Sequence, residues 1–333
     1  MLALRLISPG PVSESSLALT TLAAPRLAPH ALFLKIRACG LCHTDLHIVE
    51  GDLPIHQLPI TPGHQVVATV EQIGPGVTQF RVGDRVGVPW LYATCGECEF
   101  CQRGQENLCD RAQFTGWDVD GGYAEYVTVH ENFAVSIPAS FSDEQAAPLL
   151  CAGLIGYRSL RQADLQPGEH LGLFGFGASA HIAIQIARHW GCRVSVFTRG
   201  PAHRALAELL GAAWVGGSDE KPPTLLDRAV TFAPVGSLVP QALAHLRKGG
   251  TLAINAIHMS PIPEMDYNLI YGERTVRSVA NATRRDAAEF LPLAAEIPVQ
   301  TEVQAFPLEE ANRALLMLKR SEIKGAGVLV INR

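Results

Sequence analysis

From about residue 168 onward, short apolar runs alternate with amphipathic runs, and this alternation restricts the fold more than any other pattern in the chain. His170–Phe174 and Arg193–Thr198 are apolar enough for buried strands, whereas Ala178–Trp190 carries apolar residues at helical spacing. When strands and helices alternate, each helix carries the chain back across the sheet, so consecutive strands pair in parallel. This part of the chain therefore predicts an α/β domain with a doubly wound parallel sheet.

The first 150 residues have a different rhythm, in which short apolar runs are broken by glycine and proline. The runs that predict strands are Ala31–Arg37, Gln65–Ile73, Arg85–Pro89 and Ala124–Val129. We expect a mainly antiparallel domain here. The end of the chain adds helices near 286–296 and at 308–320 and a strand at 327–331. A chain of 333 residues, 47% of them hydrophobic, has enough material for two cores.

The overall charge argues against two classes of partner. A net charge of −5 and an isoelectric point near 6.2 give no electrostatic reason to expect nucleic acid or an anionic membrane. The opening apolar run is too short for a signal segment, and no later run reaches the roughly 18–20 apolar residues of a spanning helix. We therefore expect a cytoplasmic protein with no nucleic-acid or membrane partner.

Four of the eight cysteines are clustered, at Cys95, Cys98, Cys101 and Cys109. A disulfide framework is typical of small secreted chains, which lack a large core. Four thiolates at these spacings can instead close a tetrahedral shell around one zinc ion, with no position left for a substrate. The alternatives are redox or packed core cysteines, or a zinc ribbon that binds nucleic acid. Nearby carboxylates weaken the ribbon interpretation because they would repel phosphate; they belong to Glu97, Glu99 and Glu106.

A second group of metal-binding residue types is spread along the chain. Cys42 in the stretch CGLCHTDLH could supply a thiolate, His64 in TPGHQ an imidazole, and Cys151 in PLLCAG a second thiolate. A catalytic zinc needs about three protein ligands and one free position. Each residue also has an ordinary interpretation, the histidine in a loop and the last cysteine in a core. The remaining cysteines, Cys39 and Cys192, are expected to be packed core thiols.

A glycine-containing turn stands between the strand at His170–Phe174 and the helix that follows it. It fits the pattern G-x-G-x-x-A and includes Gly175, Gly177, Ala178, Ser179 and Ala180. Glycines here permit a tight turn and close approach of the backbone to a ligand, and the helix N-terminus then faces a pyrophosphate. The pattern is weak alone, but in this strand-turn-helix context it predicts a dinucleotide site.

Taken together, these motifs resemble those of the zinc-dependent medium-chain alcohol dehydrogenases. The Cys-His-Thr-Asp-x-His stretch, the Gly-His motif, the four-cysteine segment, the mid-chain cysteine and the late dinucleotide unit occur in this order over nearly the whole chain. The resemblance implies a GroES-like catalytic domain over residues 1–152 and 283–333 and a Rossmann domain over residues 153–282. It also implies a catalytic and a structural zinc ion in each chain, and a homodimer or homotetramer.

The resemblance further implies a role for each matched residue. The catalytic zinc would be held by Cys42, His64 and Cys151, and the structural zinc by Cys95, Cys98, Cys101 and Cys109. Thr44 would accept the proton of the alcohol held at the zinc, and His47 would pass it toward solvent. Asp45 would hydrogen-bond the second ring nitrogen of His64, and His43 would face the cofactor pyrophosphate. The implied reaction is hydride transfer between a primary alkyl or aryl alcohol, or its aldehyde, and NAD(P).

The sequence departs from the family pattern at four positions without losing an implied ligand. Gln65 stands where the family signature has glutamate, which makes the surroundings of the zinc less negative. The other departures are Ala68 for glycine, Ile155 for threonine and Ala326 for arginine. The alternative function is a catalytically silent relative with a binding or structural role. Such a relative would be free to lose Thr44 or His47, and both are present.

Cofactor choice is expected to depend on the end of the second strand of the dinucleotide unit. An NAD-selective site has an acidic residue there, whereas this chain has Thr198 followed by Arg199, with Arg204 nearby. A hydroxyl and a guanidinium can receive a 2′-phosphate, so we expect a preference for NADP(H). If Arg199 is only a solvated charge, the enzyme would accept either cofactor.

The substrate is expected to be a small alcohol or aldehyde. Trp90 and Trp117 would form an aromatic wall of the substrate pocket, although either could belong to the core instead. Cys151 argues against a polyol substrate, because polyol-oxidising relatives usually carry glutamate as the third zinc ligand.

Overall fold

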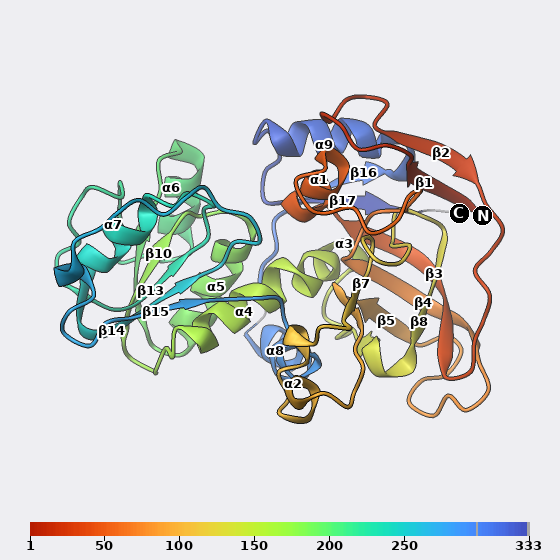
Figure 1. The fold of residues 1–333 in the computed structure, drawn as a ribbon, viewed down its shortest axis with the longest axis horizontal. Helices are drawn as coiled ribbons and strands as arrows, with labels where there is room; N and C mark the ends of the chain where they lie inside the picture. Colours follow the sequence, from red (N-terminus) through yellow and green to blue (C-terminus); the bar gives the residue numbers. More distant parts are fainter. Residues whose placement is uncertain (298, 332–333) are drawn as a thin grey trace. The chain divides into compact units, whose positions relative to one another are not determined.

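The computed structural model describes residues 1–297 and 299–331, and the chain divides into two compact units. The first unit comprises Met1–Cys151, Asn281–Ala295 and Gln300–Arg333, and the second comprises Ala152–Ala280 and Glu296–Val299. In Figure 1 the colours show the chain building the first unit, then the second, and returning to the first. Of the helices that the described residues form, none has the length and apolar character needed to cross a membrane.

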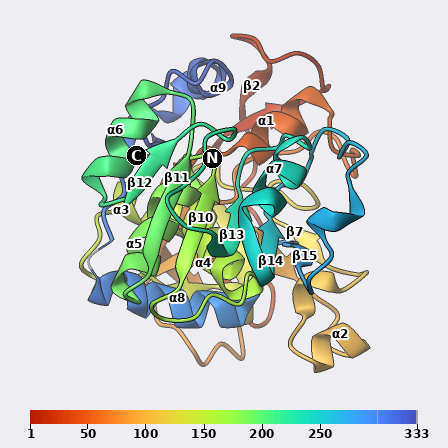
Figure 2. The same ribbon diagram turned by 90° about the vertical axis from the view of Figure 1, so that its left-hand side faces the viewer.

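The second unit is built on a six-stranded sheet (Figure 2). Its strands are β10 (His170–Phe174), β11 (Arg193–Phe197), β12 (Trp214–Gly216), β13 (Leu226–Thr231), β14 (Leu246–Ile254) and β15 (Thr275–Ser278). They lie in the order β12-β11-β10-β13-β14-β15, and every neighbouring pair is parallel. The order runs outward in both directions from β10 and β13, as in a doubly wound Rossmann sheet. The predicted parallel α/β fold is confirmed.

The helices of the second unit are α4 (Ala152–Gln162), α5 (Ala178–His189), α6 (Pro201–Leu209) and α7 (Leu238–His245). All five residues of β10 are buried, as expected for a strand covered on both faces. The rings of Phe174 and Phe197 stack with their centroids 4.0 Å apart at the carboxyl ends of β10 and β11. Because α5 follows β10 directly, its N-terminus also lies at this edge of the sheet, where ligands of such folds bind.

The first unit is built on a seven-stranded sheet. Its strands are β3 (Ala31–Gly40), β4 (Val66–Ile73), β5 (Arg85–Val88), β8 (Tyr126–His130), β9 (Val135–Ser136), β16 (Val303–Pro307) and β17 (Ala326–Val330). The order is β16-β17-β3-β4-β5-β9, with β8 also paired to β3. Only β16 and β17 pair in parallel. The mainly antiparallel domain predicted from the short apolar runs is confirmed.

Smaller elements complete the first unit. Two small antiparallel sheets pair β1 (Leu2–Leu6) with β2 (Leu17–Thr21) and β6 (Leu91–Ala93) with β7 (Gln113–Phe114). The helices are α1 (His43–Glu50), α2 (Glu99–Gln102), α3 (Asp143–Ala146), α8 (Arg284–Glu296) and α9 (Ala311–Lys319). The long central strand β3 ends at Gly40, and Cys42 and α1 follow it almost directly in the chain.

Among the elements that the sequence did not predict are two helices close to the candidate sites. Helix α1 is rich in threonine, aspartate and histidine, which have only modest helix propensity, and helix α4 contains two glycines. Both helices are instead defined by tertiary packing and by their ends; Gly51, for example, terminates α1 with a left-handed φ of 80°. Strand β14 begins at Leu246, which pairs with Leu226 of β13.

Candidate active site and metal centres

Helix α1 places Thr44, Asp45 and His47, which were noted in the sequence, close to Cys42. It begins directly after Cys42, whose backbone N–H donates to the carboxylate of Asp45 at 2.8 Å. This contact is one half of a capping box, in which the side chain of the third helical residue satisfies the N-cap backbone. The helix therefore fixes Thr44, Asp45 and His47 relative to Cys42.

Cys42, His64 and Cys151 come together although they are far apart in the sequence. Their ligand atoms all lie within 4.8 Å of one another, and the sulfurs of Cys42 and Cys151 are 4.0 Å apart. Cys42 precedes α1, His64 lies just before β4, and Cys151 follows the 3₁₀ turn Ala147–Leu150. The two cysteines are half-buried, whereas His64 is fully buried.

The ring of His64 tests whether this group suits a metal ion. Its Nδ1 shares a hydrogen bond with Asp45 Oδ1 at 3.1 Å, whereas its buried Nε2 has no hydrogen-bond partner among the described residues. A buried polar atom without a partner is costly and calls for an explanation. One imidazole nitrogen and two sulfurs are also a donor set of zinc sites that keep a fourth position open. These residues therefore fit a zinc ion.

The protonation of the group also favours a cation. Burial acts to lower the pKa of His64, but the charge and hydrogen bond of Asp45, together with the neighbouring Cys42, outweigh burial and raise the pKa to about 10. The hydrogen bond from Cys151 holds the pKa of Cys42 well below its ordinary value, against the effect of burial. The buried group is thus rich in negative charge, and a metal ion can supply the positive charge that a second ring proton would otherwise bring.

The residues expected to move a proton lie beside this group. Thr44 Oγ1 is 3.7 Å from Cys42 Sγ. His47 is three residues further along α1 and therefore on the same helix face, with its Nδ1 2.9 Å from Asp52 Oδ2. The side chains of His47 and Asp52 are 20% and 45% exposed, so this pair reaches solvent. His43, at the start of α1, is exposed.

The two tryptophans expected in a substrate wall lie side by side next to His64. The rings of His64 and Trp90 meet edge to face, with their centroids 4.7 Å apart and their planes at 76° to each other. Trp117 stacks on Trp90 at 5.8 Å and donates its indole N–H to the carbonyl of Pro54 at 2.8 Å. The ring of His56 in turn stacks on Trp117 at 4.2 Å. An aromatic stack therefore extends from His64.

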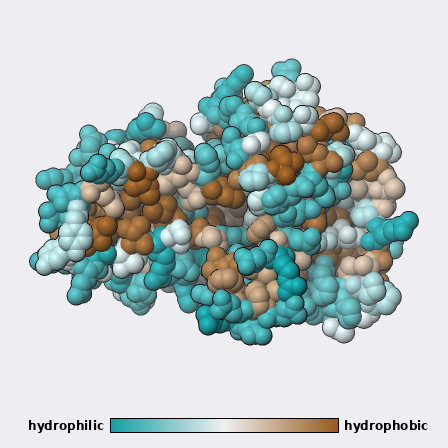
Figure 3. All heavy atoms as spheres, viewed as in Figure 1, coloured by the Kyte–Doolittle hydropathy of each residue, from teal (hydrophilic) through white to brown (hydrophobic). Residues whose placement is uncertain are grey.

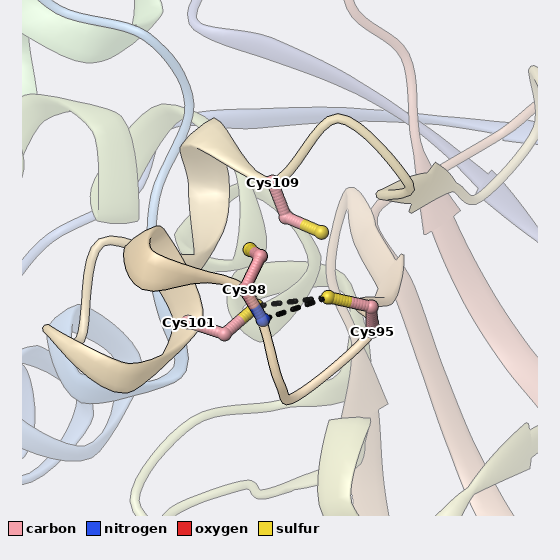
Figure 4. A group of neighbouring side chains, drawn as sticks. All are labelled: Cys95, Cys98, Cys101 and Cys109. Carbon is pink, nitrogen blue, oxygen red and sulfur yellow. Dashed lines mark hydrogen bonds between the residues drawn. The ribbon is translucent and has the colours of Figure 1, made fainter.

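The four clustered cysteines form a second group, which we name the cysteine lobe (residues 95–109). Figure 4 shows the four side chains converging on one centre, and all four sulfurs lie within 4.8 Å of one another. The backbone N–H groups of Glu97 and Cys98 lower the pKa of Cys95 to about 6, and the Cys98 N–H donates to its sulfur at 3.3 Å. Four sulfurs at these separations fit a tetrahedral zinc ion that has no open position.

Glu106, in the cysteine lobe, does not contribute the free negative charge that the sequence suggested. It is 6% exposed, and its carboxylate accepts hydrogen bonds from Arg284 of α8, at 2.8 Å from the backbone nitrogen and 2.8 Å from Nε. The Arg284 guanidinium also lies over the ring of Phe133, 4.7 Å from its centroid. The carboxylate is thus neutralised by an ion pair, and it attaches the lobe to α8. Glu97 and Glu99 are exposed, and each pairs with an arginine: Glu97 with Arg111, and Glu99 with Arg103.

The glycine-containing turn lies at the carboxyl edge of the Rossmann sheet. Gly175 has a left-handed φ of 90°, and a Cβ there would lie 3.0 Å from the backbone nitrogen of Ala233. A Cβ at Gly177 would meet nothing within 4 Å, so the space beside this residue is open. Gly177 is the N-cap of α5 and supplies no side-chain cap. The first turn of α5, which contains Ala178, Ser179 and Ala180, is thus available to an anion.

The residues expected to choose the cofactor gather at the end of β11. Thr198 follows the strand directly, and its carbonyl accepts a hydrogen bond from Arg204 Nε at 3.0 Å. Arg204 also lies 3.6 Å from a carboxylate oxygen of Glu220. The Arg199 side chain is exposed. Thr198 and Arg204 are thus in contact, while Arg199 is directed to solvent.

Comparisons with known proteins agree with this arrangement. Residues 28–139 match the family model described as the alcohol dehydrogenase GroES-like domain, and residues 180–296 match the one described as zinc-binding dehydrogenase. The chain is 48% identical over 329 residues to the probable alcohol dehydrogenase AdhA of Mycobacterium tuberculosis, covering 97% of this chain and 95% of that protein. The chain belongs to the zinc-dependent medium-chain alcohol dehydrogenase family.

Other members of the medium-chain alcohol dehydrogenase family extend this similarity. An alcohol dehydrogenase of Geobacillus stearothermophilus is 37% identical, over 92% of this chain and 94% of its own. Among solved structures, the cinnamyl alcohol dehydrogenase of Sorghum bicolor has a TM-score of 0.90 at 28% identity and covers 99% of this chain and 97% of its own. The chain is therefore an oxidoreductase of the GroES-like and Rossmann type, as predicted.

Three side chains near the two candidate metal-binding groups were not predicted from the sequence. Asp52 pairs with His47, Arg284 pairs with Glu106, and Tyr123 is buried beside the Asp45 carboxylate. Asp52 follows the glycine that ends α1, which was the one local signal for its position. The other two reach their partners only through the tertiary fold, so the sequence held no signal for them.

Proposed function

We propose that this protein is a zinc-dependent alcohol dehydrogenase and aldehyde reductase that acts on primary alkyl or aryl alcohols with a nicotinamide cofactor. The observation that carries the proposal is the buried His64 Nε2, which has no hydrogen-bond partner among the described residues and lies beside the sulfurs of Cys42 and Cys151. Zinc at such a group acts as a Lewis acid, which lowers the pKa of an alcohol hydroxyl or polarises a carbonyl. Membership in the family supports the same reaction class.

The side chains of the first unit would hold the metal and move the proton. Cys42, His64 and Cys151 provide the ligand atoms, and the Asp45 carboxylate fixes the tautomer of His64 through Nδ1. The Thr44 hydroxyl would accept the proton of the substrate alcohol and release its own toward His47. The His47–Asp52 pair would release that proton to solvent. In the reducing direction the same groups would deliver a proton to the product.

Replacing His47 with alanine should slow alcohol oxidation about tenfold near neutral pH, and by less at high pH. Without the imidazole, the proton from Thr44 has to leave through water, and hydroxide at high pH replaces the missing acceptor. The pH dependence of kcat measures this effect. Asp52→Asn, which keeps His47, should give a smaller change in the same direction. A pH profile of His47→Ala that matches the unaltered enzyme would remove His47 from the proton path.

The aromatic stack supports an apolar substrate with a flat or unbranched chain. Trp90 and Trp117 present indole rings next to His64, and indoles suit aryl and alkyl groups better than polyols. A thiol at Cys151 further separates this chain from the polyol-oxidising pattern. Benzyl alcohol and benzaldehyde are therefore suitable first substrates.

The end of β11 supports a preference for NADP(H). The carboxylate that would bind the ribose hydroxyls in an NAD-selective site is replaced by Thr198. Arg199 is exposed next to it and can approach a 2′-phosphate, whereas Arg204 is held by the Thr198 carbonyl and by Glu220. We therefore assign the phosphate contact to Arg199 and a supporting role to Arg204.

Reduction of benzaldehyde should proceed with NADPH at a kcat/KM at least tenfold above that with NADH, which corresponds to about 1.4 kcal/mol. The zinc content of the same sample is measured, and about two ions per chain are expected. Thr198→Asp should remove the preference, because a carboxylate repels the 2′-phosphate. Thr198→Asn has the same side-chain shape as the Thr198→Asp variant but no charge, and it should retain most of the preference. A clear NADH preference would contradict the cofactor assignment. Zinc binding without turnover of any alcohol or aldehyde would favour a catalytically silent relative.

The exposed edge of the second unit supports self-association of the protein. One of the two edge strands of the Rossmann sheet, β15, is exposed at all four positions. Figure 3 shows apolar side chains on the visible face of the second unit, and Tyr267, Tyr271 and Ile262 are 70%, 66% and 46% exposed. An unpaired sheet edge beside apolar side chains supports a homodimer or homotetramer.

Free thiols at both metal-binding groups favour the cytoplasm, where thiols stay reduced.

A further inference from the structure

The carboxylate of Asp45 is completely buried and needs hydrogen-bond donors. Three are present: the backbone nitrogen of Cys42 at 2.8 Å, the backbone nitrogen of Gly63 at 3.2 Å, and His64 Nδ1 at 3.1 Å. An ionised carboxylate can accept about four hydrogen bonds, and a buried charge is costly when its acceptor positions stay unused. The structure therefore leaves room for one more donor to Asp45.

Tyr123 is packed against the same turn of the chain. It is 0% exposed, and a Cβ at Gly63 would lie only 2.4 Å from Tyr123 Cδ1, so the ring fits against a position that only glycine can occupy. The backbone N–H of Tyr123 donates to the carbonyl of Pro62 at 3.0 Å. Tyr123 thus has a fixed position beside the turn that carries His64.

The hydroxyl of Tyr123 is buried close to Asp45. Among the described residues it has no hydrogen-bond partner of regular geometry. Burial first, and then the negative charge of Asp45, raise the pKa of Tyr123 well above its ordinary value. A buried hydroxyl without a partner therefore lies near a carboxylate that can still accept a hydrogen bond.

We infer that Tyr123 is a positioning residue for the metal site, because its hydroxyl supplies the fourth hydrogen bond to Asp45. A hydrogen bond from Tyr123 fixes the orientation of the Asp45 carboxylate, so its Oδ1 stays bound to His64 Nδ1. The His64 ring then presents Nε2 to the metal. The inference rests on the proposed function, which assigns a zinc ion to Cys42, His64 and Cys151. It adds a buried tyrosine to the residues that determine how firmly that ion is held.

The test compares zinc release from the holoenzyme and from Tyr123→Phe, which removes one oxygen atom and keeps the ring. A chromogenic chelator follows the release over time. One of the two zinc ions should leave about tenfold faster in the variant, the low end of the effect of such outer partners. The zinc of the cysteine lobe should leave at an unchanged rate and serves as an internal control. Tyr126→Phe, in which the altered ring stacks on Phe33 at 5.1 Å, is the matched variant and should behave as the unaltered enzyme.

A double-mutant comparison distinguishes positioning through Asp45 from a general loss of packing. In an Asp45→Asn background, Tyr123→Phe should add less than a twofold change in release, because the hydroxyl has lost the charged acceptor through which it acts. Thermal unfolding of each variant is recorded as well, and a lower Tm with unchanged zinc release would overturn the inference. A full tenfold effect in the Asp45→Asn background would overturn it too. Unaltered enzyme that holds zinc only in the cysteine lobe would instead refute the proposed function, and the inference with it.

Discussion

Cys151→Ala is expected to abolish turnover, with kcat/KM for benzaldehyde falling at least about a thousandfold. The cysteine supplies one of three ligand atoms that lie within 4.8 Å of one another, and the remaining two do not suffice to hold a catalytic zinc. Loss of that ion removes its stabilisation of developing charge, and a thousandfold corresponds to about 4 kcal/mol. The measurement is kcat/KM together with the zinc content, which should fall to about one ion per chain.

The fold should survive this change, and a second cysteine provides the control. Cys151 is only half-buried, and its replacement leaves the cysteine lobe untouched. Cys192→Ala makes the same chemical change at a buried thiol of the second unit, whose sulfur lies 3.4 Å from the carbonyl of Gln166. That variant should keep its activity and both zinc ions. A Cys151→Ala enzyme with substantial turnover and one zinc ion would show that the ligand assignment is wrong.

Cys109→Ala is expected to cause the largest loss of stability, with Tm falling by about 10 °C. The buried residues of the cysteine lobe are Glu106, Asn107 and Cys109, so the lobe has no apolar core of its own. Bound metal therefore has to supply much of its folding free energy. A loss of about 4 kcal/mol at about 2–4 °C for each kcal/mol gives a shift of this size.

Thermal unfolding and zinc content measure this second effect. Cys109→Ala should keep the zinc ion at Cys42, His64 and Cys151, and so retain turnover well below its Tm. It should thus be the converse of Cys151→Ala, which loses turnover and keeps most of its stability. An unchanged Tm with both zinc ions still bound would contradict the assignment of a structural zinc to the lobe.

Several parts of this molecule follow from short stretches of sequence. The alternation after residue 168 predicted the parallel sheet because each βαβ unit is specified by neighbouring residues, whose spacing decides which faces are buried. The cysteine lobe was predictable for a similar reason, since its four ligands lie between residues 95 and 109. Helices α1 and α4 were missed because polar residues or glycines conceal their periodicity, and tertiary contacts define them instead.

The candidate metal-binding group of Cys42, His64 and Cys151 could not be decided from local sequence alone. Three candidate residues were visible in the sequence, but each also had an ordinary interpretation as a loop or core residue. What removed the ambiguity is the buried His64 Nε2, which lies beside two sulfurs and lacks a hydrogen-bond partner among the described residues. Glu106 illustrates the converse, because its apparent free charge is neutralised by Arg284, a residue far along the chain.

By itself, the sequence determined the two architectures, the identity of the metal-binding residue types and the absence of an acidic residue at the end of β11. These are properties of residue type and short spacing, which a linear chain already contains. Only the tertiary structure decided that Asp45 meets His64, that His47 meets Asp52, and that Tyr123 is buried near Asp45. Such contacts join distant or separately oriented side chains, and burial, which sets their energies and their pKa values, exists only once the chain has folded.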